Sequence, residues 1–204
     1  MTLKLYYSPT SPFARKIRIA LIELGLDHQL EHLSLNPYEA GPDFWSVNPL
    51  SKVPVLVTPE GVALPDSRLI LDYVRTLGDA LEGGDGSAQL WPNRRRQQLA
   101  DGLIDAAVIA NLEQRREPQL ISAGWFDRQA AAISRTLAEL ERDASLLRSS
   151  GAITPVEISV MVALAYLDLR LGQLQWRLQN PGLSAWFEMF SQRPSVRATE
   201  PVLP

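Results

Sequence analysis

The sequence predicts a two-domain protein: a small α/β domain of order βαβ, short helix and ββα, followed by an all-helical bundle domain. Up to about Gly78, short strand-like runs alternate with helical segments. A glycine-rich stretch without periodicity, GDALEGGDGSAQLWP (78–92), interrupts this pattern, and only long helical patterns follow it. We therefore expect an α/β domain at 1–78, a linker at 79–92 and a helical domain at 93–204.

The first domain begins with a strand, LKLYY (3–7). From Pro12 to Leu24, apolar residues recur at helical spacing, and Gly25 stands where a glycine commonly ends a helix. HQLEHLSL (28–35) reads as a second strand, so the three segments make a βαβ unit with parallel strands. The apolar face of this helix is expected to comprise Phe13, Ile17, Ala20, Leu21 and Leu24, with Arg15, Lys16, Arg18 and Glu23 elsewhere.

Three further elements complete the first domain. PYEAGPDFWSVNP leaves room for a short helix around 43–46, and VPVLVT and VALP, separated by PEG, make a β-hairpin. DSRLILDYVRTLG closes the domain as a helix, whose apolar face is expected to comprise Leu69, Ile70, Tyr73, Val74 and Leu77.

The second domain consists of helices. Two long amphipathic segments, 93–118 and 125–151, precede ITPVEISVMVALAYLDLRL, which is apolar all round and should be the buried central helix. Thr154 and Glu157 predict a capping box at its start, with Pro155 at the first helical position. LSAWFEMFSQR ends the series and the RPSVRATEPVLP tail is expected to be extended, while RRR at 94–96 is assigned to surface charge.

Composition argues against several function classes. The 20 basic and 23 acidic residues give a net charge of −3, which disfavours nucleic acid as a partner. Since no apolar run approaches the roughly 20 residues that span a bilayer and the N-terminus lacks signal-peptide features, we expect a cytoplasmic protein without membrane contact. Cysteine is absent, which excludes disulfides and thiolate metal sites. His28 and His32 lie four residues apart without an evident third ligand, so we expect no metal site.

Four separated stretches carry a family resemblance: YYSPTSPFARKIRIAL, NPLSKVPVLV, DSRLILDYV and ITPVEISV. With the domain order, they resemble the glutathione transferase superfamily, whose N-terminal half is thioredoxin-like. The resemblance covers nearly the whole chain and is to serine-type bacterial members of the delta-, theta- and zeta-like kind. It implies glutathione as co-substrate, no metal and a homodimer.

The resemblance also implies individual site residues. Ser11 matches the catalytic serine, which would hydrogen-bond the glutathione thiolate, although Ser11 is equally a good N-cap for the first helix. Val53-Pro54 matches the cis-proline pair, where the Val53 backbone would pair with the bound peptide, and an edge-strand proline is the alternative. Asp66 and Ser67 match the turn that binds the γ-glutamyl end of glutathione.

The chain departs from the family pattern before the cis-proline pair, where Ser51 and Lys52 replace a histidine. Lys52 would bind the glycyl carboxylate of glutathione as a point charge, and a solvated lysine is the alternative. Tyr7 is the main rival of Ser11 for the catalytic role, with Ser8 and Thr10 further behind. Phe13 and Tyr7 are also expected near the pocket of the second substrate, and Arg68 would add positive charge at the site.

The function implied is conjugation of glutathione to a small hydrophobic electrophile, as in detoxification, with peroxidase work as a side activity. A free thiol has a pKa of about 8.5, so the enzyme would have to stabilise the thiolate for reaction at neutral pH. The alternative is a non-catalytic binding or regulatory protein with the same fold. A thiol–disulfide oxidoreductase is disfavoured because the chain contains no cysteine.

Overall fold

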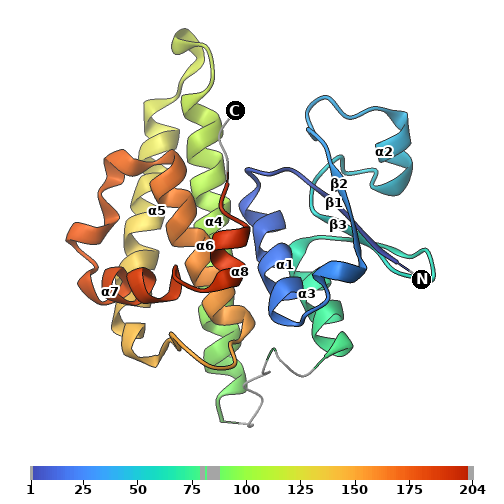
Figure 1. The fold of residues 1–204 in the computed structure, drawn as a ribbon. Helices are drawn as coiled ribbons and strands as arrows, with labels where there is room; N and C mark the ends of the chain where they lie inside the picture. Colours follow the sequence, from blue (N-terminus) through green and yellow to red (C-terminus); the bar gives the residue numbers. More distant parts are fainter. Residues whose placement is uncertain (1, 79–80, 82–87, 202–204) are drawn as a thin grey trace. The chain divides into compact units, whose positions relative to one another are not determined.

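A computed structural model describes residues 2–78, 81 and 88–201, and the chain divides into two compact units (Figure 1). The first unit is Met1–Glu82 together with Pro194–Pro204, and the second is Gly83–Arg193. The residues from Pro194 on therefore group with the first unit and not with the helical one. Most of the linker expected at 79–92 lies outside the described residues, and from Leu90 on this segment is helical.

The first unit is built on a four-stranded mixed sheet in the order β2-β1-β3-β4. β1 pairs in parallel with β2 and antiparallel with β3, and β3 pairs antiparallel with β4. The predicted βαβ unit and hairpin are thus confirmed, except that a 3-10 turn at Asp27–Gln29 shortens the second strand. The elements are β1 (Leu3–Tyr7), α1 (Pro12–Glu23), β2 (Leu30–Ser34), α2 (Pro42–Val47), β3 (Val55–Val57), β4 (Ala63–Pro65) and α3 (Ser67–Val74).

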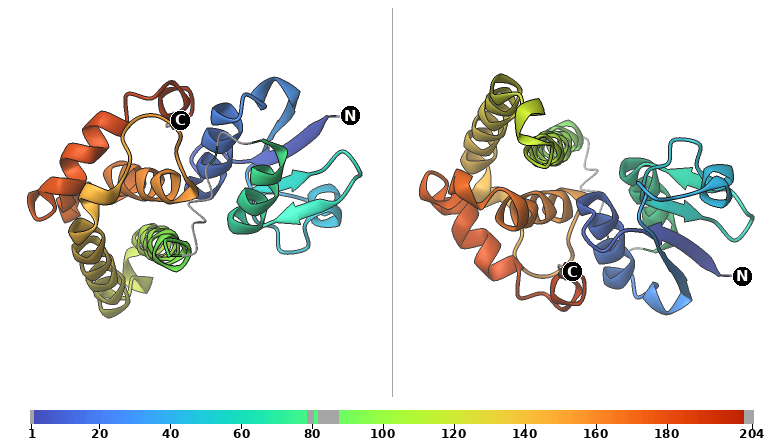
Figure 2. Two further views of the ribbon diagram at one scale, coloured as in Figure 1. Left: turned by 90° about the horizontal axis from the view of Figure 1, so that it is seen from below. Right: turned by 90° about the horizontal axis from the view of Figure 1, so that it is seen from above.

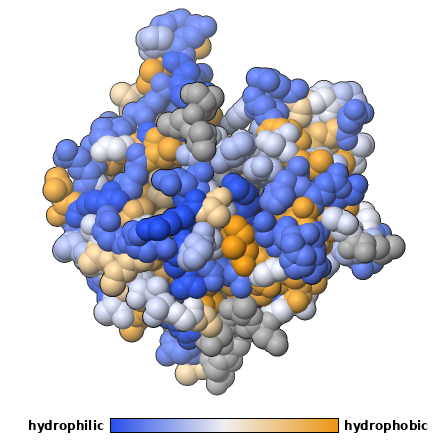
Figure 3. Space-filling view, in the orientation of Figure 1, coloured by the Kyte–Doolittle hydropathy of each residue, from blue (hydrophilic) through white to orange (hydrophobic). Residues whose placement is uncertain are grey.

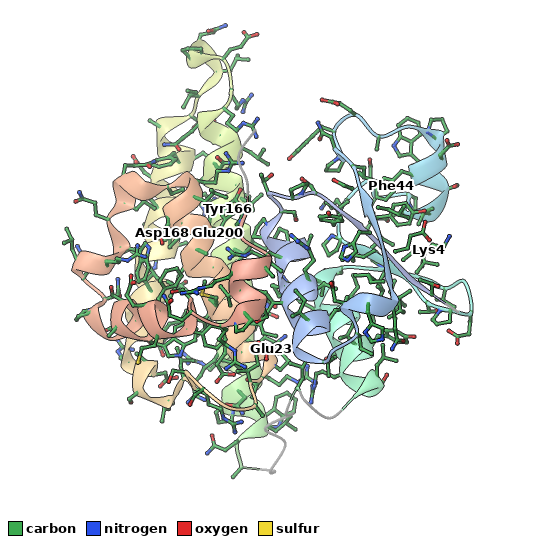
Figure 4. The ribbon with its side chains drawn as sticks, viewed as in Figure 1. Lys4, Glu23, Phe44, Tyr166, Asp168 and Glu200 are labelled. Atoms are coloured by element: carbon green, nitrogen blue, oxygen red, sulfur yellow. The ribbon has the colours of Figure 1, made fainter. Side chains whose placement is uncertain are left out.

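Helices lie on both faces of this sheet. Alternate residues of β1 point to opposite faces and pack against different helices. Leu3 and Leu5 are buried on the face where α1 and α3 pack against each other. On the opposite face lies Phe44 of α2, labelled in Figure 4. The ring of Tyr6 packs against it, with the ring centroids 5.5 Å apart.

The buried faces of α1 and α3 differ from the sequence prediction. On α3, Leu69 is 48% exposed while Leu71 is fully buried, and Leu77, in the 3-10 turn Arg75–Leu77, is 38% exposed. On α1, Lys16 is fully buried and Arg15 nearly so, although the pattern assigns both to the polar side. The reason is that α1 packs against both α3 and α8, so that more than one stripe of its surface is covered.

The second unit is a helical bundle whose central helix is α6. Figure 2 shows α6 in the middle of this unit, between α4 and α7, and α6 contacts both of these helices. Most residues of α6 from Pro155 to Leu167 are buried, which confirms the predicted central helix. The helices are α4 (Leu90–Gln114), α5 (Ala123–Arg142), α6 (Pro155–Arg170) and α7 (Pro181–Phe190), with 3-10 turns at Pro118–Leu120, Ala144–Leu146, Gly172–Leu174 and Trp176–Leu178.

Side-chain contacts at the helix ends support this bundle. The Thr154 hydroxyl accepts the Val156 N–H at 3.1 Å, and the Glu157 carboxylate accepts the Thr154 N–H at 2.8 Å, so the predicted capping box is confirmed. Arg95 and Arg96 form 2.6 Å ion pairs with Glu139 and Asp143. Two of the arginines at 94–96, assigned to surface charge from the sequence, therefore link α4 to the end of α5.

The C-terminal tail, expected to be extended, contains a short helix, α8 (Pro194–Ala198), that packs against α1. The Ser195 hydroxyl donates a hydrogen bond to Glu23 at the end of α1 (Figure 4). Pro194 occupies the first position of this helix, where its missing N–H costs nothing, and the element that α8 packs against lies near the other end of the chain.

The surface shows no single chemical character on the face drawn in Figure 3, where hydrophilic and hydrophobic residues are interspersed. Among the helices of the described residues, none combines the length and apolar character needed to cross a bilayer.

Candidate active site

The topology of the first unit brings three of the predicted site segments to one end of its sheet. Tyr6 of β1 lies opposite Val55 of β3, and Val55 lies opposite Pro65 of β4, both in antiparallel register. The end of β1, the beginning of β3 and the end of β4 therefore lie at the same end of the sheet. Ser11 follows β1, Val53-Pro54 precedes β3, and Asp66-Ser67 follows β4.

Ser11 is the N-cap of α1. Its Oγ accepts the N–H of Ala14 at 3.2 Å, and its own N–H donates to the Ser8 carbonyl at 3.0 Å. Because a hydroxyl also carries one donor hydrogen, Ser11 retains an O–H for a further acceptor while it caps the helix. The positive end of the α1 dipole lies at the same place, so an anion held there would be stabilised.

Tyr7, the rival of Ser11, is the last residue of β1. Its ring lies 5.1 Å from the Arg18 guanidinium on α1 and meets the His32 ring edge-on, with centroids 5.9 Å apart. His28 belongs to the 3-10 turn and His32 to β2, so the two do not share a helix face. Among the described residues, no group of three potential metal ligands occurs.

The Val53-Pro54 peptide bond is cis, as the resemblance implies. Pro54 is buried and Val53 is half-buried, just before β3 begins. No atom of the described residues forms a hydrogen bond with the N–H or C=O of Val53. Since buried or half-buried backbone groups are normally paired, this residue offers one donor and one acceptor to an extended ligand.

Asn48, which no motif in the sequence indicates, holds the loop that leads to Val53. Asn48 is 2% exposed; its Nδ2 donates to the Lys52 carbonyl at 2.8 Å, and its Oδ1 accepts the Leu50 N–H at 3.1 Å. Ser51, with a φ of 50°, also donates its hydroxyl hydrogen to the Pro37 carbonyl at 3.1 Å. Lys52 is exposed on this loop, which the hydrogen bonds of Asn48 and Ser51 hold in place.

Asp66 and Ser67 begin α3 in contrasting environments. Asp66 is exposed with a φ of 72°, a conformation that Asp tolerates better than most residues, and its Oδ1 accepts the Arg68 N–H at 2.8 Å. Ser67 is only 3% exposed, and its Oγ accepts a hydrogen bond from Lys16 Nζ at 3.3 Å. Lys16 is a second residue of this site that no sequence motif indicates, because helical spacing places it on the polar side of α1.

The neighbouring cation on α1, Arg15, has a perturbed ionisation. Burial lowers its pKa to about 10; the negative charge of Glu200 opposes this effect, and the nearby Arg18 adds to it. Arg15 therefore stays charged at neutral pH, and it requires partners that satisfy a buried guanidinium.

Comparisons with known proteins identify the family. The models of the glutathione S-transferase N-terminal and C-terminal domains match residues 10–77 and 123–188. Over 204 residues, covering 98% of each protein, the chain is 34% identical to the uncharacterized GST-like protein YibF of Escherichia coli K12. The chain belongs to the glutathione S-transferase family.

Solved structures of other glutathione transferases have the same fold as this family member. One, from Pseudomonas fluorescens Pf-5 with bound glutathione, is 37% identical, has a TM-score of 0.91 and matches over 99% of this chain and 100% of its own. Another, from Methylobacterium radiotolerans in complex with glutathione sulfonate, is 30% identical, has a TM-score of 0.88 and matches over 100% and 97%. These similarities confirm the predicted thioredoxin-like domain followed by a helical domain.

Within this glutathione S-transferase family member, the N-terminal family match spans Ser11, Val53-Pro54 and Asp66-Ser67. The roles assigned to these residues stay predictions. Phe13 lies half-buried in the first turn of α1, beside the same end of the sheet.

Proposed function

We propose that this protein binds glutathione at the end of the sheet and joins its sulfur to a small electrophile, so that the glutathionyl group is transferred. The observation that carries the proposal is Val53, whose N–H and C=O have no hydrogen-bond partner among the described residues and lie between two helix N-termini at one sheet end. Glutathione is an extended peptide with an anion at each end and a thiol in the middle. A central backbone pairing site flanked by anion-stabilising groups matches that chemistry.

Each end of glutathione has a counterpart at the site. The first turn of α3, with the Ser67 hydroxyl, suits the α-carboxylate of the γ-glutamyl group, and Asp66 suits its ammonium. At the other end, the exposed ammonium of Lys52 suits the glycyl carboxylate. Glutathione in the Pseudomonas fluorescens relative and S-(propanoic acid)-glutathione in a second structure from that organism support this class of ligand.

The proposed chemistry depends on Ser11. Its O–H would donate to the glutathione sulfur, and the positive end of α1 would add a fixed potential, so that the thiolate becomes the favoured form. The thiolate then attacks an electrophilic carbon, a carbon–sulfur bond forms, and the leaving group departs with its bonding electrons. Ser11 has no need to act as a base, because the thiol proton can pass to water.

Three further features of the proposal come from the family resemblance. The chain is expected to form a homodimer, to act in the cytoplasm and to take small hydrophobic electrophiles. Light scattering at micromolar concentration tests the first of these, and a mass of 22.7 kDa would contradict it.

Calorimetric titration with glutathione, followed by an assay with 1-chloro-2,4-dinitrobenzene, tests the proposed function. S-methylglutathione serves as the control ligand, since it retains both ends of the peptide but carries no thiol. We expect both ligands to bind and only glutathione to form the coloured thioether. Absence of binding would overturn the proposal, whereas binding without turnover across a panel of electrophiles would favour the non-catalytic alternative.

A further inference from the structure

Lys16 is a fully buried lysine for which the proposed reaction has no direct use. Its side chain has no exposed surface, on a helix whose neighbouring residues Ile17 and Ile19 are also buried. A buried ammonium group is unfavourable unless hydrogen bonds and charges compensate for its lost hydration. One compensating contact is to Ser67, whose Oγ accepts a hydrogen bond from Lys16 Nζ at 3.3 Å.

This contact determines what the Ser67 hydroxyl can do. A lysine ammonium has only donors, so Ser67 Oγ is the acceptor and its own hydrogen must point to another acceptor. Ser67 is also the first residue of α3, an eight-residue helix. Asp66 accepts the Arg68 N–H, but within the described residues no protein group accepts the N–H of Ser67 or Leu69.

We infer that Lys16 is a positioning residue, which acts through Ser67 to select the α-carboxylate of the γ-glutamyl group. It orients the Ser67 O–H as a donor toward the carboxylate, and its positive charge lies one hydroxyl group behind the anion. This inference rests on the proposed function. Because Lys16 acts at the end of the ligand away from the thiol, it is expected to change binding and not the pH dependence of turnover.

The test compares two ligands by calorimetry. One is glutathione, and the other is 4-aminobutyryl-cysteinyl-glycine, in which hydrogen replaces the α-carboxylate of the γ-glutamyl group. Lys16→Met, which removes the charge and donor but keeps a long side chain, should weaken glutathione binding about tenfold or more. The same variant should weaken the analogue by less than about twofold, and Lys16→Arg should recover part of the loss.

The matched control is Lys4→Met, the same chemical change at an exposed position near the start of β1 (Figure 4). Lys4 Nζ there pairs with the Glu31 carboxylate at 3.2 Å. It should leave the affinities for both ligands unchanged. Equal weakening of both ligands by Lys16→Met would assign Lys16 a purely structural role and overturn the inference. No weakening of glutathione binding would do the same.

Ser67→Ala keeps the inference testable if Lys16→Met fails to fold. It leaves Lys16 in place, and it must show the same selective loss for glutathione. Where Lys16→Met and Ser67→Ala both fold, the double variant should bind glutathione with the affinity of whichever single variant binds it more weakly. The reason is that Lys16 acts through Ser67, so the two losses do not add. Wild-type affinity of Ser67→Ala for glutathione would overturn the inference alone, whereas wild-type protein that does not bind glutathione would overturn the proposed function with it.

Discussion

The guanidinium of Arg15 on α1 donates hydrogen bonds to the carbonyl of Val196 and the hydroxyl of Thr199, at 3.1 and 3.4 Å, from 181 and 184 residues away in the chain. Thr199 in turn donates its hydroxyl hydrogen to carbonyls of α8, with Ser195 O at 2.9 Å. The C-terminal tail is therefore a structural part of the first unit. It supports the helix whose N-terminus carries Ser11.

Arg15→Met should destabilise the protein by about 2 kcal/mol, because each lost bond to a charged donor is worth about 1.5–3 kcal/mol while removal of a buried charge offsets part of the loss. For a chain of this length, that corresponds to a decrease in Tm of about 4–8 °C. Arg135→Met, an exposed position on α5, is the control. Deletion of residues 194–204 should have a similar effect, less than additive with Arg15→Met, and an unchanged Tm in both variants would contradict the role of the tail.

Ser11→Ala should reveal two separable losses. Removal of the cap should cost about 0.5–2 kcal/mol of stability at every pH, whereas the loss of turnover should shrink as the pH rises and the thiol ionises unaided. Ser11→Asp retains a capping acceptor but places a negative charge beside the thiolate, so it should be more stable yet less active than Ser11→Ala. The measurements are thermal unfolding and a pH–rate profile; full activity of Ser11→Ala together with inactivity of Tyr7→Phe would transfer the catalytic role to Tyr7.

Asp66→Asn should raise the KM for glutathione several-fold and leave kcat nearly unchanged, because the residue would contact the ligand far from its sulfur. Asparagine keeps an acceptor for the Arg68 N–H and tolerates the φ of 72°, so the variant isolates the charge. Asp72→Asn, on the exposed side of α3, should change both constants by less than about twofold. A KM unchanged in Asp66→Asn would remove this carboxylate from the binding site.

Asn48→Ala should weaken both stability and glutathione binding, since it leaves the Lys52 carbonyl and the Leu50 N–H without their buried partner. The expected cost is about 1–3 kcal/mol in the free energy of unfolding by denaturant. The KM for glutathione should rise because the loop that presents Lys52 and Val53 loses its anchor. Asn36→Ala removes a comparable turn contact at an exposed site and should cost less than about 0.5 kcal/mol; equal costs for the two variants would refute the anchoring role.

Several secondary-structure elements of this protein could be predicted from local sequence signals. The strand-like run LKLYY, the helical spacing after Pro12 and the three-residue spacing of Thr154 and Glu157 each involve neighbours in the chain, and each predicted its element correctly. The cis bond at Val53-Pro54 and the grouping of Ser11 with Asp66-Ser67 depended on resemblance to a family, because local chemistry alone leaves several alternatives.

The tertiary structure alone decided which polar residues become buried. Lys16 and Arg15 lie on the polar side of α1 by spacing, yet α3 and α8 cover them, and their partners Ser67 and Val196 lie 51 and 181 residues further along the chain. The exposure of Leu69 and the packing of α8 against α1 were likewise not predicted from spacing within their own segments. The spacing of residues within a helix specifies which of them share a face, but burial depends on which distant elements pack against that face, and this information is present only when the whole chain has folded.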